Sequence, residues 1–207
     1  MEIVLVGRSN VGKSSVIKQL TGKRVRVGKR PGVTRRPYRY RCGELDLVDM
    51  PGFGFMAGVS RERREEIKTS IVRYLERNRR RILFALEVLD ARAFGEIVER
   101  WKRRGQVPVD VEMFQFLQEL ELRPIVVVNK IDLIYPEARD DVLDNICEKL
   151  GMSFPWRQWG DVVVPFSAKT GEGWENVTRL IRERLTACGK PHFNRFLKRG
   201  RSRFTNR

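Results

Sequence analysis

Residues 7–14 read Gly-Arg-Ser-Asn-Val-Gly-Lys-Ser, and this stretch decides the fold class. It follows an apolar run at 2–6 and precedes a predicted helix from about Lys13 to Leu20. A glycine-bearing turn between a strand and a helix lets backbone amides and the helix N-terminus surround phosphate groups. Lys13 is expected to reach the β- and γ-phosphates, and Ser14 to bind Mg²⁺. The expected phosphate-binding residues are Gly7, Arg8, Ser9, Asn10, Val11, Gly12, Lys13, Ser14 and Ser15.

The order of the apolar runs predicts an α/β fold. Nearly continuous runs, as at 82–89, are typical of parallel strands buried on both faces, and Gly43-Glu44 joins two short strands in a hairpin. Strands are expected at 2–6, 38–42, 45–48, 82–89, 124–128 and 162–166. Helices are expected at about 13–20, 61–77, 109–122, 136–151 and 174–185, with an irregular polar connection at 91–108. Residues 1–187 should form a doubly wound, mostly parallel six-stranded sheet with one antiparallel edge strand and helices on both faces.

Two further motifs are expected to complete the phosphate site. Thr34 lies in a basic loop, where a threonine can bind Mg²⁺ and touch the γ-phosphate, and Asp49 can hold the metal through a water. The Gly52 amide can sense the γ-phosphate, so Lys13, Thr34 and Gly52 are the expected catalytic groups. Phe53 follows directly, and its ring cannot orient a water, which predicts slow hydrolysis. The loop residues assigned to the site are Pro31, Gly32, Val33 and Thr34.

The base is predicted to be guanine. Asn129-Lys130-Ile131-Asp132 follows a buried strand, at the sheet edge where ligands dock in open α/β sheets. The Asp132 carboxylate can accept hydrogen bonds from N1 and the 2-amino group of guanine, which adenine does not offer. Asn129 should support the ring and Lys130 should cover it. Ser167-Ala168-Lys169 also follows a strand, and the Ala168 amide should meet guanine O6.

The net charge of +16 comes from two segments. Residues 23–41 hold nine Lys or Arg and residues 190–207 hold seven, with no acid in either segment. Such basic stretches attract polyanions, and nucleic acid is the expected partner. The tail at 188–207 also carries Phe193, Phe196 and Phe204, which either stack on bases or anchor the tail to the core. The expected nucleic-acid contacts are Lys29, Arg30, Arg35, Arg36, Lys198, Arg199, Arg201 and Arg203.

Other classes of protein are disfavoured by composition. The three cysteines are scattered and unpaired in spacing, so neither a disulfide framework nor a zinc site is expected. His192 is the only histidine, which disfavours a histidine-dependent nucleophilic triad. No apolar run reaches the roughly 18 residues that span a bilayer. We expect a cytoplasmic monomer with no membrane or DNA partner.

The five motifs in order resemble a family of small GTPases related to translation factors, the EngB family. The resemblance covers about residues 2–187 and lies in 7–15, 31–35 and the aromatic-rich stretch 48–55, while 95–116 is similar to archaeal members. It implies a Ras-like P-loop domain that binds and hydrolyses GTP with Mg²⁺. It further implies a role in maturing the large ribosomal subunit, with its rRNA as partner, and a link to cell division and septation.

Several alternatives stay open at this point. The chain could be a GTP-gated RNA-binding switch with negligible hydrolysis, as Phe53 favours, or a GTPase that acts on tRNA or the division machinery. Asn10 matches an asparagine that supports a potassium ion in several K⁺-activated GTPases, so K⁺ is a further expected cofactor. The alternative for Asn10 is a P-loop hydrogen bond that orders the basic loop.

Overall fold

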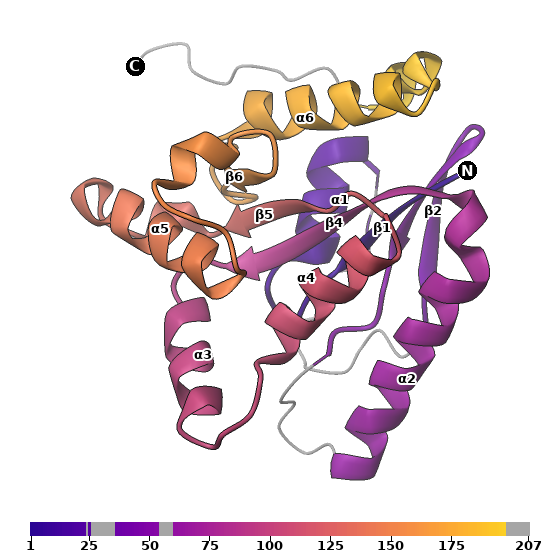
Figure 1. Ribbon diagram of the computed structural model, residues 1–207. Helices are drawn as coiled ribbons and strands as arrows, with labels where there is room; N and C mark the ends of the chain where they lie inside the picture. Colours follow the sequence, from indigo (N-terminus) through magenta and orange to yellow (C-terminus); the bar gives the residue numbers. More distant parts are fainter. Residues whose placement is uncertain (24, 26–35, 54–59, 198–207) are drawn as a thin grey trace.

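The computed structural model describes residues 1–23, 25, 36–53 and 60–197 (Figure 1). A six-stranded sheet with the order β2-β3-β1-β4-β5-β6 forms the centre of the fold. All neighbouring strands are parallel except β2, which pairs antiparallel with β3 at one edge. The predicted doubly wound fold is therefore confirmed. The strands are β1 (Glu2–Val6), β2 (Tyr38–Cys42), β3 (Leu45–Asp49), β4 (Ile82–Asp90), β5 (Ile125–Asn129) and β6 (Val163–Pro165).

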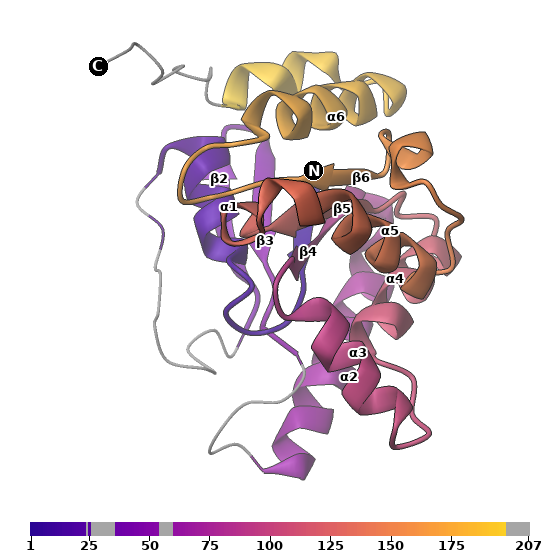
Figure 2. The ribbon, with the colours of Figure 1, turned by 90° about the vertical axis from the view of Figure 1, so that its left-hand side faces the viewer.

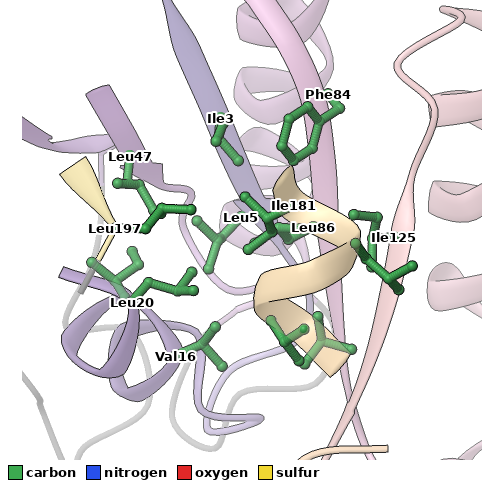
Figure 3. Packing of buried hydrophobic residues seen from close by; sticks show 14 of the residues in the cluster. Ile3, Leu5, Val16, Leu20, Leu47, Phe84, Leu86, Ile125, Ile181 and Leu197 are labelled. Atoms are coloured by element: carbon green, nitrogen blue, oxygen red, sulfur yellow. The ribbon is translucent and has the colours of Figure 1, made fainter. Parts of the chain in front are cut away.

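Helices cover both faces of the sheet (Figures 1 and 2). In β1, Ile3 and Leu5 face α1 (Lys13–Thr21) and α6 (Trp174–Ala187), as the buried side chains of Figure 3 show. Val4 and Val6 point the other way because side chains alternate along a strand. That second face is covered by α2 (Arg61–Asn78), α3 (Phe94–Lys102), α4 (Val109–Glu119) and α5 (Arg139–Lys149).

Local sequence explains where α2 begins. Ser60 precedes α2, and its hydroxyl accepts a hydrogen bond from the Arg63 amide at 3.3 Å, which satisfies one free donor of the first turn. Ile67, Ile71 and Leu75 follow at a spacing of four and are all buried. Packing of this apolar stripe stabilises a helix whose other residues are mostly charged.

One prediction was wrong. Residues 91–108, expected to be an irregular polar connection, contain the helix α3. Phe94 and Val98 are buried and Trp101 packs beside α2 and α4, so three apolar side chains form one stripe at helical spacing. The charged residues between them hid this stripe.

The C-terminal segment returns to the core. A 3₁₀ helix at Pro191–Phe196 follows α6, and Phe193 and Leu197 are buried. Figure 3 places Leu197 beside Leu20 and Leu47. A Cβ atom on Gly43, in the β2–β3 turn, would lie 2.3 Å from the Phe196 ring, so this ring rests on the hairpin. Phe193 and Phe196 therefore anchor the chain to the core, whereas Phe204 lies outside the described residues.

Within the described part of the chain, no helix is both long and apolar enough to cross a bilayer.

Candidate nucleotide-binding site

The predicted motifs meet at one edge of the sheet. The phosphate-binding loop at residues 7–14 (the P-loop) follows β1, Asp49 ends β3, Asn129 ends β5, and Ser167 follows β6. Since these strands are parallel, their carboxyl ends lie at the same edge, which is where open α/β sheets bind ligands.

Lys13 lies inside the P-loop. Its Nζ donates hydrogen bonds to the carbonyl oxygens of Gly7 and Arg8, each at 2.9 Å. Burial lowers the pKa of Lys13 to about 8, while Asp49 and Asp110 favour its charged form. The side chain therefore places a cation among backbone groups at the mouth of the loop, where a phosphate is expected.

Ser14 and Asp49 form a pair of oxygen ligands. The Ser14 hydroxyl donates to Asp49 Oδ2 at 2.5 Å, and no partner among the described residues satisfies the buried Oδ1. Burial raises the pKa of Asp49, and Lys13 and Ser14 oppose that rise. A hydroxyl and a carboxylate are hard oxygen ligands of the kind that Mg²⁺ prefers, so these residues fit the metal expected from the sequence.

The segment after β3 packs directly on the P-loop. A Cβ atom on Gly52 would lie 2.4 Å from Ser9 Oγ and 2.7 Å from the Ser9 nitrogen, so only glycine fits this approach. The Phe53 amide faces the Gly7 carbonyl at 3.4 Å, and Phe53 forms an isolated β-bridge with Arg8. The Phe53 ring is 1% exposed and packs in the core with residues of α2 and α4. It points away from the site, so packing accounts for this side chain.

Asn129 joins the phosphate and base motifs. Its Nδ2 donates to the Val11 carbonyl at 2.7 Å, and its Oδ1 accepts from the Ala168 amide at 3.0 Å. The side chain is buried, so both bonds are shielded from water. One residue thus holds the P-loop against the loop that follows β6.

The other residues of the two predicted guanine-binding motifs are held in place by neighbouring side chains. Ser167 Oγ donates to Asp132 Oδ1 at 2.7 Å, which fixes the carboxylate. The Lys130 ammonium pairs with Asp90 at the end of β4. The Ala168 amide, expected at guanine O6, is directed to Asn129 instead. The structure therefore brings the P-loop, the Asp49–Gly52 motif and both base motifs together.

Part of the expected site lies outside the described residues. This applies to Pro31, Gly32, Val33 and Thr34, and to the nucleic-acid candidates Lys29, Arg30, Arg35, Lys198, Arg199, Arg201 and Arg203. Arg36 is described and is exposed.

Sequence reasoning missed two buried acids beside the P-loop. Asp110, in the first turn of α4, pairs with Arg8 across 102 positions of sequence. Glu87, on β4, is fully buried, and its pKa is raised well above the ordinary value by burial and by the nearby Asp110 charge. Burial also raises the pKa of Asp110, while the Arg8 guanidinium opposes that shift. The only sequence signal for Glu87 was an acid inside an apolar strand.

Comparison with known proteins places this site in a family. A family model described as 50S ribosome-binding GTPase matches residues 2–130. A protein of Methanopyrus kandleri named probable GTP-binding protein EngB is 56% identical, over 95% of this chain and 98% of its own length. The chain belongs to the EngB family of GTPases. The EngB relative of Methanococcus maripaludis is 47% identical, over 91% of this chain and 82% of its own.

A solved structure supports the EngB assignment. The crystal structure of a probable GTP-binding protein engB superposes with a TM-score of 0.81 and is 43% identical, covering 90% of this chain and all of its own. The resemblance to archaeal EngB proteins that the sequence predicted is confirmed. The family match runs from β1 to Lys130, so it includes the P-loop, Asp49, Gly52 and Asn129.

Proposed function

We propose that this EngB-family GTPase is a slow molecular switch in assembly of the large ribosomal subunit. The main support for nucleotide binding is the position of Asn129. Its side-chain amide forms hydrogen bonds with Val11 in the P-loop and with Ala168 in the loop that follows β6. Because one buried side chain connects the two halves, phosphate binding and guanine selection belong to a single rigid site.

The residues have separable tasks in the proposed reaction. A water oxygen attacks the γ-phosphorus, the bond to the β–γ bridging oxygen breaks, and GDP and phosphate leave. Lys13 is proposed to hold the β- and γ-phosphates, and the Gly52 amide to contact the γ-phosphate. Ser14, with Thr34 and a water held by Asp49, is proposed to hold Mg²⁺. When bound, this ion neutralises charge on the phosphates.

Hydrolysis is proposed to be slow because the residue after Gly52 is a buried phenylalanine. Its ring offers no hydrogen bond to a water. Asn10 has a positive φ of 65° and is exposed at the P-loop, which motivates the hypothesis that K⁺ assists the reaction. Turnover measured in K⁺ and in Na⁺ buffers tests it, and equal rates would exclude K⁺ assistance.

The proposed partner is the large ribosomal subunit or its precursor, contacted through rRNA. Its support is the family description, 50S ribosome-binding GTPase, and the concentration of the +16 charge in two segments. Counterion release makes such binding dependent on salt. The proposal includes a monomer that acts in the cytoplasm, with no membrane or DNA partner. The link to cell division is part of the same proposal.

Co-sedimentation with large ribosomal subunits tests the partner. The comparison is between a non-hydrolysable GTP analogue and GDP, at low and high salt. We expect sedimentation with the analogue, little with GDP, and release by salt. No binding with either nucleotide would favour the tRNA or division-machinery alternative.

A second candidate is a binding switch whose own hydrolysis is negligible, which the inward position of Phe53 favours. Single-turnover hydrolysis with and without large subunits separates the two. Turnover of the isolated protein supports the slow GTPase, and turnover only with subunits supports the switch that needs an activator.

A further inference from the structure

A buried ion pair connects the P-loop to α4. Arg8 Nη1 lies 3.3 Å from Asp110 Oδ2, and the two side chains are 12% and 1% exposed. An exposed pair contributes little to stability, but removal of one partner from a buried pair leaves a charge without compensation. The position of Arg8 is therefore tied to the first turn of α4.

Arg8 is also held by the residues that are expected to sense the γ-phosphate. Its carbonyl accepts a hydrogen bond from Lys13 Nζ at 2.9 Å, and it forms the β-bridge with Phe53. The next residue, Ser9, lies against Gly52 so closely that a Cβ there would approach within 2.4 Å. A shift of Arg8 would thus move Lys13 and Gly52 relative to the phosphates.

Glu87 is a second buried acid beside this pair; burial raises its pKa, and its carboxyl is close enough to the Asp110 charge for that charge to raise the pKa further. It pairs in register with Val6, directly before the P-loop, and is fully buried. Within the described residues, neither of its carboxylate oxygens has a hydrogen-bond partner, and Asp110 Oδ1 has none either. No group of three or more His, Cys, Asp or Glu side chains that could hold a metal ion occurs in that part of the chain. The Arg8 guanidinium is the cation that donates a hydrogen bond to Asp110, while the Lys13 ammonium also favours the charged form of this acid without a direct bond.

We propose that Asp110 is a positioning residue that acts through Arg8, setting where the P-loop meets Gly52 and thereby the ratio of GTP to GDP affinity. This inference rests on the proposed function, since it concerns the same nucleotide site. GDP lacks the γ-phosphate that the Gly52 amide is proposed to contact, so a displaced Arg8 should weaken GTP binding more than GDP binding.

Asp110→Asn tests the role because it keeps the shape and removes the charge. We expect the ratio of GTP to GDP affinity to fall about fivefold to tenfold relative to wild type, a usual size for coupling between sites. Equilibrium titration with fluorescent GDP and a non-hydrolysable GTP analogue measures both affinities. Glu112→Gln is the matched control, since Glu112 lies on the same helix in a half-exposed pair with Lys68, and its ratio should stay at the wild-type value.

A double-mutant cycle separates positioning from a merely structural role. In an Arg8→Ala background, Asp110→Asn should cause no further change in the ratio, because the charge acts through the guanidinium. An equal change in both backgrounds, or an unchanged ratio in Asp110→Asn, overturns the proposal. If Asp110→Asn does not fold, Arg8→Lys provides the test: the ratio should fall, and a wild-type ratio would overturn the inference.

Different results would refute the proposed function and the role of Asp110. If wild type binds neither nucleotide, the proposed function fails. If wild type binds both and the variants keep its ratio, only the role of Asp110 fails.

Discussion

Asn129→Asp tests whether one side chain holds the phosphate and base halves of the site together. The substitution keeps the volume and keeps the acceptor for the Ala168 amide. It replaces the Nδ2 donor by an oxygen that faces the Val11 carbonyl at the wild-type distance of 2.7 Å. Two acceptor oxygens, one from the new carboxyl group and one from Val11, then face each other at a residue that is 3% exposed in the wild-type protein.

The expected loss follows from these contacts. A buried acceptor left without its partner costs about 1–3 kcal/mol, and burial of the new carboxylate adds to this. We expect a loss of about 3 kcal/mol in the free energy of unfolding, which lowers Tm by about 6–12 °C for a domain of this size. GDP affinity should fall by more than about tenfold, equivalent to about 1.4 kcal/mol.

Denaturant unfolding without nucleotide, at several pH values, measures the effect. Burial and the Val11 carbonyl favour the protonated acid, which can donate a hydrogen bond as the amide does. Its folded-state pKa is therefore raised, and the stability of the variant should fall as pH rises above the ordinary aspartate pKa, about 3.9. Asn145→Asp, at an exposed position of α5, is the matched control. A loss below about 1 kcal/mol at neutral pH would refute the connecting role of Asn129.

Three further outcomes are expected. Gly52→Ala should lower GTP turnover about 100-fold, with a smaller effect on GDP binding, because the added Cβ meets Ser9; steady-state kinetics and GDP titration measure this. Glu87→Gln should be more stable than wild type, and the difference in free energy of unfolding should grow with pH above 4.5 by up to about 1.4 kcal/mol per pH unit, because the raised folded-state pKa of Glu87 makes wild type lose stability as pH rises. A difference that stays constant across pH would contradict this. Gly43→Ala, at a φ of 67° and against Phe196, should cost more than about 1 kcal/mol and speed tryptic cleavage after α6.

Much of the fold could be predicted because a strand that is buried on both faces of the sheet appears in the sequence as a nearly continuous apolar run. The runs that form β4 and β5 have few polar residues, and the turn at Gly43 separates two short strands. The helix α3 was missed for the opposite reason. Phe94, Val98 and Trp101 carry its stripe, but Glu96, Glu99 and Arg100 lie between them and Lys102, Arg103 and Arg104 follow, so the segment has the composition of a polar connection.

The residues of the site likewise divide into those that a local motif identifies and those that only the packing of the fold brings together. Lys13, Asp49 and Asn129 could be assigned because each belongs to a motif whose members are adjacent in sequence. Arg8 and Asp110 are 102 residues apart, and no local pattern says that the start of α4 lies beside the P-loop. Only the packing of α4 on the sheet brings them together.

The strand order has a consequence for synthesis of the chain. The phosphate-site residues described here lie between Gly7 and Phe53, and β4, which completes that half of the sheet, ends at Asp90. Asn129 and Ala168 come much later. A domain generally folds as a unit during synthesis. Because Asn129 bonds both the P-loop and Ala168, the growing chain is expected to complete its nucleotide site only after Ala168 has emerged, once more than four-fifths of its 207 residues have been made.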